Sequence, residues 1–261
     1  MVVQKLKLHE WFLVYQLDQI KKTMHHIPIY LKLDISAYVN EYKGLNTKIP
    51  TTALLIKIIG TWAAANPTVN KMLFRTFFGL RFLKGDEIRI NFPLGIQWQG
   101  QTAVTAIVIR NPQLKTIEQI HDEIKIAKSK PLSAYPITYW AYSHVNHFLN
   151  RFLLGAIHTV ISNFPSIYWR KGGGCISISS LSNFFVKDHL FSACSFGPTG
   201  FTFFYKDIEV VDGKTYLNLS IAADHNTFAG YEIVELVNRL LVLPKIAKAN
   251  RSQNITQDLH V

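Results

Sequence analysis

One segment near the C-terminus constrains the fold more than any other. Apolar, strand-forming residues run over 219–223, Asp224 and His225 follow, and a helical pattern covers 231–242. This order predicts a strand that passes through a short loop into a helix. His225 therefore stands where a strand ends, a position at which catalytic side chains often lie. On these residues alone, a structural hydrogen-bonding role and a catalytic role both stay open.

The composition predicts a globular, basic protein. The 261 residues are 48% hydrophobic and 13% aromatic, which is typical of a packed core and not of a disordered chain. Lys and Arg exceed Asp and Glu by 28 to 17, so the net charge is +11 and the surface should attract anions. The basic residues are scattered and form no stripe interleaved with aromatic residues, so we expect no nucleic-acid partner.

Helical and strand patterns alternate along the chain and predict one α/β domain over 1–245. Helices are expected at 8–24, from Ser36 onward, at 51–65, 116–128 and 231–242. Strands are expected at 29–35, 88–97, 103–110, 175–181, 200–205 and 215–223. The glycine run 172–174 indicates a bend or a close approach, and the loop-to-strand order excludes a P-loop. The polar residues 246–261 are expected to form a disordered tail.

Residues 136–170 differ from the rest, because they are rich in aromatic and basic side chains, and they are expected to form two amphipathic helices inserted into the domain. Three roles are open for this insertion: a packing arm, a lid over an apolar substrate, or a peripheral membrane contact. His144 and His147 are three residues apart without an evident third ligand, so no metal site is expected.

The sequence indicates a cytoplasmic protein. Cys175 and Cys194 lack the spacing of a zinc or redox motif, and the first residues lack the apolar stretch of a signal peptide. The most apolar stretch, 148–169, is interrupted by Asn150, Arg151 and other polar residues, so it is not expected to span a membrane.

His225 and Ser179 suggest a reaction type. An imidazole that titrates near neutrality can take a proton from a thiol, hydroxyl or amine. A serine hydroxyl such as that of Ser179 can donate to the oxyanion of a tetrahedral intermediate. Because no Gly-x-Ser-x-Gly elbow occurs, direct transfer between two bound substrates fits better than a covalent acyl-enzyme.

Four stretches resemble the catalytic domain shared by the dihydrolipoyl acyltransferases of 2-oxoacid dehydrogenase complexes and chloramphenicol acetyltransferase. Ile-Pro-Ile-Tyr-Leu-Lys-Leu-Asp-Ile-Ser at 27–36 resembles the first strand of that family, and 54–70 resembles its core helix with the turn that follows. Residues 91–111 are similar to its central strands. Gly-Gly-Cys-Ile-Ser-Ile-Ser-Ser-Leu at 173–181 and Ala-Asp-His at 223–225 resemble its two active-site segments.

The resemblance implies a two-layer α/β sandwich with a mixed sheet and a homotrimer with the active site between subunits. It assigns the general base to His225 and the oxyanion donor to Ser179 of a neighbouring subunit, with Asp224, Asn226 and Gly230 as supporting loop residues. Coenzyme A or a phosphopantetheine thioester is implied as a co-substrate, with no permanently bound cofactor. The positive charge would suit its phosphates or an acidic carrier protein.

Two residues depart from the family pattern His-x-x-x-Asp-Gly. Ala229 replaces the Asp or Asn before the glycine, and Asn226 replaces the arginine usual after the histidine. The sequence predicts a stand-alone acyltransferase and does not identify its acceptor. The alternative is a trimeric binding or scaffold protein that has kept the fold and lost the chemistry.

Overall fold

The computed structural model describes residues 6–43, 49–180 and 198–243. The main sheet has the strand order β1-β8-β7-β6-β4-β5. Its strands are β1 (His26–Asp34), β4 (Arg89–Trp98), β5 (Gln101–Arg110), β6 (Ile176–Ser180), β7 (Phe201–Val211) and β8 (Lys214–Asp224). β6 runs parallel to β4 and β7, and the other pairs are antiparallel, so the predicted mixed sheet is confirmed.

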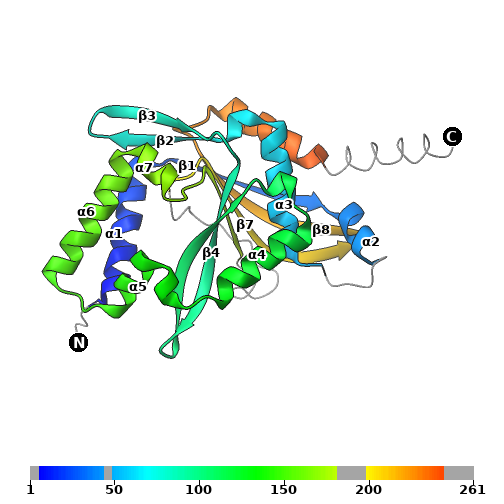
Figure 1. Ribbon diagram of the computed structural model, residues 1–261. Helices are drawn as coiled ribbons and strands as arrows, with labels where there is room; N and C mark the ends of the chain where they lie inside the picture. The colour runs from blue at the N-terminus through cyan, green and yellow to red at the C-terminus, as the bar shows by residue number, and fades with distance from the viewer. Residues whose placement is uncertain (1–5, 44–48, 181–197, 244–261) are drawn as a thin grey trace, which may run out of the picture.

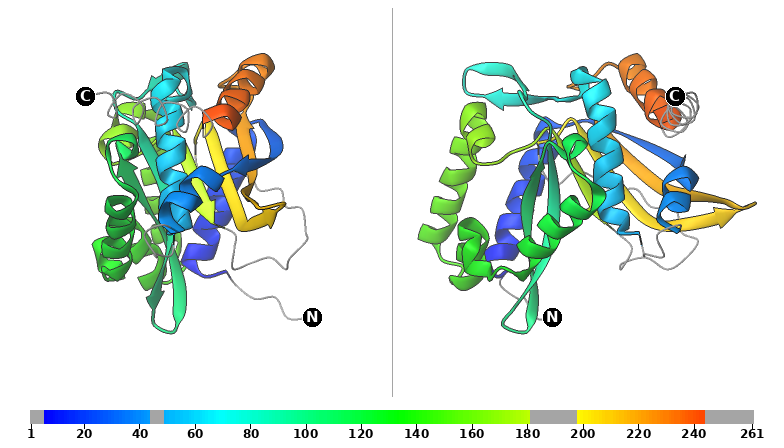
Figure 2. Two further views of the ribbon diagram at one scale, coloured as in Figure 1. Left: turned by 90° about the vertical axis from the view of Figure 1, so that its right-hand side faces the viewer. Right: turned by 45° about the vertical axis from the view of Figure 1, so that its right-hand side comes forward.

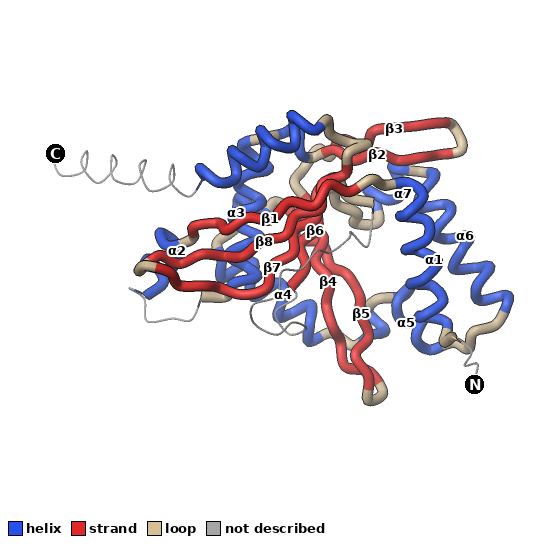
Figure 3. Tube along the Cα trace, turned by 180° about the vertical axis from the view of Figure 1, so that it is seen from behind, coloured by secondary structure: helices blue, strands red, loops and turns tan. Residues whose placement is uncertain are grey.

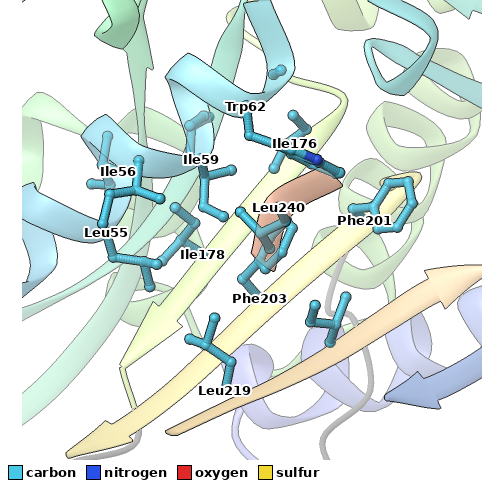
Figure 4. Packing of buried hydrophobic residues seen from close by; sticks show 14 of the residues in the cluster. Leu55, Ile56, Ile59, Trp62, Ile176, Ile178, Phe201, Phe203, Leu219 and Leu240 are labelled. Carbon is cyan, nitrogen blue, oxygen red and sulfur yellow. The ribbon is translucent and has the colours of Figure 1, made fainter. Parts of the chain in front are cut away.

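The helices α2 (Ser36–Lys43), α3 (Thr51–Ala65), α4 (Ile117–Ser129) and the helix at 230–243 accompany the sheet (Figure 1). α3 is buried along most of its length because nearly every residue between Ala53 and Ala63 is apolar. Its Trp62 stands edge-on to Phe201 and Phe203 of β7, and the Trp62 Nε1–H donates to the carbonyl of Leu236 at 2.9 Å. Figure 4 shows this layer of side chains between α3 and the strands.

Turns and close approaches follow the predicted glycines. The β7–β8 hairpin turns at Asp212 and Gly213, both with positive φ, as the Asp-Gly pair predicts. A Cβ on Gly174 would lie 2.5 Å from the carbonyl oxygen of Arg89, so only glycine fits beside β4. The glycine run therefore marks a close approach, as expected.

A small second sheet was not predicted. β2 (Lys71–Thr76) and β3 (Gly79–Lys84) form an antiparallel hairpin outside the main sheet. Its inward residues Met72 and Phe74 pack with Cys175 into a cluster of their own, while the outward aromatic residues are exposed. The apolar pattern was too short and too mixed to identify it.

The inserted region forms three helices, and not two: α5 (Pro136–Ser143), α6 (Phe148–Asn163) and α7 (Pro165–Arg170). Pro165 begins α7 directly after Phe164, because proline favours the first helical position. α1 (Leu8–Thr23) packs against α5 and α6, so these three helices form an arm beside the main sheet (Figures 2 and 3). In the described part of the chain, no helix is long and apolar enough to cross a membrane.

Candidate active site

His225 directly follows the end of β8, as predicted. β1 pairs with β8 so that His26 lies opposite Asp224, and the His225 amide donates to the carbonyl of His25 at 2.7 Å. The start of β1 therefore fixes the backbone of the histidine, whose side chain is exposed. A reacting molecule can reach this ring from solvent.

Asp224 organises the loop that carries His225. Its side chain is buried, with only 2% of the residue exposed. Oδ1 accepts from the amides of His25 (3.1 Å) and Asn226 (3.3 Å), and Oδ2 accepts from the hydroxyl of Thr227 at 2.6 Å. A buried carboxylate needs such donors, and three of them hold the loop in one shape.

The ring orientation of His225 is set by a bond to the backbone. Nδ1 lies 3.0 Å from the carbonyl oxygen of Phe228. A carbonyl oxygen only accepts, so Nδ1 carries the proton and Nε2 keeps its lone pair. Phe228 is itself fixed, because its buried ring packs on Phe201 at 4.7 Å between centroids. In the neutral ring of this exposed residue, Nε2 is thus the nitrogen that can act as a base.

His25 and His26 contact the loop that carries His225, which the sequence did not predict. The Asn226 side-chain amide donates to Nδ1 of His25 at 2.9 Å. Burial lowers the pKa of His26 below 6.5, although the nearby Asp224 acts in the opposite direction. The signal that could have found this is the position of both histidines at the start of β1, the strand that pairs with β8.

Ala229 stands at the N-cap of the helix 230–243. Its carbonyl accepts from the amide of Ile233 at 3.0 Å, and its amide donates to Oε2 of Glu232 at 2.8 Å. This is one half of a capping box, with glutamate supplying its part and no side-chain oxygen at the cap itself. The polar residue expected here from the family pattern would thus be a helix cap.

Ser179 lies near the C-terminal end of β6, level with the middle of β8 and five positions along the strands from His225. On β6, Ile176 and Ile178 point into the core, so Ser179 lies on the opposite face, where it is partly exposed. The register aligns Ser179 with Phe204 and Phe204 with Ser220, five residues before His225. Ser179 and His225 are therefore separated by about 17 Å along the strands and by about 10 Å across two strand spacings.

One chain therefore does not bring Ser179 and His225 together. The supporting residues do gather, because Asp224 and Asn226 contact the same loop as His225, and Gly230 begins the helix that follows it. Leu181, the last residue of the first active-site match, lies outside the described residues.

Comparisons with known proteins identify the fold. No family model matches the sequence, and no curated protein is similar to it. The structure matches the cubic core of a pyruvate dehydrogenase multienzyme complex with a TM-score of 0.62, at 18% identity over 94% of this chain and 92% of that one.

Two further structures match over most of their length. The dihydrolipoamide acetyltransferase of Azotobacter vinelandii has a TM-score of 0.62, at 15% identity over 94% of this chain and 92% of that one. A catalytic core of the 2-oxoacid dehydrogenase complex from Thermoplasma acidophilum has a TM-score of 0.61, at 14% identity over 94% and 98%. The chain therefore has the α/β fold of the catalytic cores of 2-oxoacid dehydrogenase complexes.

Proposed function

We propose that the protein is an acyltransferase that moves an acyl group from a pantetheine thioester to a thiol, hydroxyl or amine. The observation that carries this proposal is the setting of His225, an exposed residue whose ring Nδ1 lies 3.0 Å from the Phe228 carbonyl oxygen, which leaves Nε2 as the basic nitrogen of the neutral ring. Such a ring can take the proton of an acceptor as the acceptor attacks the thioester carbonyl. The same proton can then pass to the leaving thiolate.

The second half of the site comes from another subunit. Because Ser179 and His225 of one chain are separated by five residue positions along the strands and two strand spacings, the Ser179 hydroxyl can stabilise the oxyanion only at the His225 of a neighbouring subunit. A homotrimer, in which each subunit gives His225 to one site and Ser179 to the next, supplies that geometry three times. Coenzyme A or the phosphopantetheine arm of an acidic carrier protein is the proposed donor, and the net charge of +11 suits either.

The Azotobacter vinelandii enzyme supports these assignments. A serine, a later histidine and an asparagine four residues after that histidine were examined for roles in its catalytic mechanism. The proposed pair occurs here in the same order, but the fourth position after His225 is Ala229. This difference favours one second candidate, a trimeric binding or scaffold protein that binds thioesters without transferring the acyl group.

An assay of thiol release separates the acyltransferase from the scaffold protein. The donors are acetyl-coenzyme A and longer acyl-coenzyme A thioesters, and the acceptors are a panel of thiols, alcohols and amines. His225→Ala should reduce turnover at least about 100-fold. His121→Ala, which removes an exposed histidine of α4, is the matched control and should leave turnover unchanged. Thioester binding without transfer by the unaltered protein would favour the scaffold.

A mixing experiment tests the shared site. Ser179→Ala and His225→Ala chains should each be inactive alone, whereas co-expression should restore activity in about a quarter of the sites, the fraction expected for random mixing. No recovery in mixed oligomers of correct mass would contradict a site built from two subunits. As a control, co-expression of His225→Ala with His121→Ala chains should leave about half of the sites active, because every chain keeps Ser179 and half of the chains keep His225.

A further inference from the structure

We propose that the side of the molecule formed by α6 and the tip of the β2–β3 hairpin docks on an anionic lipid bilayer surface. The exposed apolar residues of this α6–hairpin face include Phe77, Phe78, Phe82, Phe148, Phe152 and Val160. Figure 1 shows the hairpin beyond one end of α6, and Figures 2 and 3 agree with this placement. The proposal does not depend on the acyl-transfer reaction.

The hairpin tip presents two aromatic rings to water. Phe77 is 76% exposed and Phe78 is 70% exposed, a costly arrangement for side chains of this kind. The tip is nevertheless held in place, because the Phe77 amide donates to Oδ1 of Asn163 at 2.6 Å. Thr76 also donates its hydroxyl to the carbonyl of Gly79 at 2.9 Å. The exposed rings are thus preformed and fixed to the end of α6.

α6 continues the apolar surface. Its Leu154 is buried in a cluster with Leu8 of α1 and Ala141 of α5. Phe148 and Phe152, one turn apart, are 77% and 61% exposed, and their rings stack with centroids 6.5 Å apart. A groove of about 650 Å³ between α6 and α1 lies beside them, with Trp11 and Tyr15 on its other side. An amphipathic helix of about 24 Å with its aromatic face outward is suited to lie in a bilayer interface.

The α6–hairpin face carries a surplus of positive charge, which indicates an anionic partner. No Asp or Glu occurs between Glu41 and Asp86, or between Glu123 and Asp188. The hairpin and the helices α6 and α7 carry six exposed cations: Arg75, Arg81, Lys84, Arg151, Arg170 and Lys171. In the described part of the chain, none of the six has an ion pair.

Basic side chains around exposed aromatic residues match the negative potential of anionic lipid headgroups and the apolar layer beneath them. A two-fold contact of this face with the same face of a second copy would bring like charges together, which disfavours a dimer through it. An anionic bilayer is therefore the occupant that satisfies both the apolar and the cationic residues.

The hairpin also connects this face to the candidate active site. The amide of Leu73 in β2 donates to the hydroxyl of Thr227 at 3.2 Å, and Lys71 lies 3.8 Å from Glu232. Docking would hold the His225 loop near the bilayer. If the proposed function holds, this step extends it by favouring a lipid-borne acyl chain or acceptor.

Sedimentation with unilamellar vesicles tests the docking. The unaltered protein should bind vesicles of phosphatidylcholine with about 30 mol % phosphatidylglycerol, and bind pure phosphatidylcholine at least about tenfold more weakly. Phe77→Ser with Phe78→Ser, and separately Phe148→Ser with Phe152→Ser, should each weaken binding about tenfold or more. Val210→Ser with Val234→Ser removes exposed valines outside this face and is the matched control, with binding unchanged.

Two outcomes would overturn the proposal. The first is equal or absent binding to both kinds of vesicle. The second is a face covered by another copy of the chain, in which case the phenylalanine variants would lower the oligomer mass by light scattering without affecting vesicle binding. The His225→Ala variant should bind vesicles normally, so failure of the acyl-transfer proposal and failure of docking give different results.

Discussion

The core beneath α3 and the helical arm use aromatic residues in opposite ways. In the core, Trp62, Phe201 and Phe203 are fully buried, and Trp62 meets both phenylalanine rings edge to face, which gives one dense interior. In the arm, the buried cluster is small, and Phe148 and Phe152 face outward. Aromatic residues therefore serve packing in one region and surface contact in the other. Substitutions should show the difference, because they should lower the free energy of unfolding far more in the core than in the arm.

The largest effect should come from Trp62→Ala. The change removes a ring without solvent exposure and leaves the Leu236 carbonyl without its indole donor, so it should lower the free energy of unfolding by about 3–5 kcal/mol. Urea titration monitored by circular dichroism measures this loss. A loss below about 1 kcal/mol, at an unchanged denaturant slope, would show that the core tolerates the cavity and would break the contrast with the arm.

Asp224→Ala should rank second. The substitution leaves the amides of His25 and Asn226 and the hydroxyl of Thr227 without their acceptor, at a cost of about 2–3 kcal/mol in unfolding free energy. Asp224→Asn keeps one oxygen acceptor and should lose less. The same urea titration compares them, and equal losses for the two variants would mean that the negative charge, and not the geometry, holds the loop.

The two regions were also predictable to different degrees. The alternation of apolar residues in β8 and the helical run of α3 predicted the elements, because burial on a sheet or against a helix imposes a clear period on the sequence. The arm and the β2–β3 hairpin were harder, because their exposed aromatic residues break that period. A third helix and a second sheet were therefore missed.

The candidate site was predictable in part. His225 at a strand end and the close approach of Gly174 follow from local patterns. The support from His25 depends on the pairing of β1 with β8, a contact between residues far apart in the chain, so no local pattern revealed it. The partnership of Ser179 with His225 across a subunit interface came from the family resemblance, and it remains a prediction.

Ala229→Asn should have a smaller effect, in the stabilising direction. An asparagine side chain at this N-cap could accept from the free first-turn amides of the helix 230–243, which should raise the free energy of unfolding by about 1 kcal/mol. Thermal unfolding of both proteins measures the gain. If the residue also supports His225, turnover should rise as well, whereas a pure cap would change stability alone.

Acidification should destabilise both regions mildly. Burial lowers the pKa of His26 beside the sheet and of His9 and His158 in the arm below 6.5. Between the folded and unfolded pKa values the unfolded chain binds more protons, so the stability present above pH 6.5 is lost as the pH falls below it. Urea midpoints at a series of pH values test this, and His158→Gln should flatten the slope in part.

The smallest effect on stability should come from Phe152→Ser in the arm. The ring is already 61% exposed, so its loss should change the free energy of unfolding by less than about 0.5 kcal/mol. The same variant should weaken binding to anionic vesicles, because the ring is proposed to enter the bilayer interface. A loss of stability comparable to that of Trp62→Ala would instead make Phe152 part of a packed interior, and the contrast between core and arm would fail.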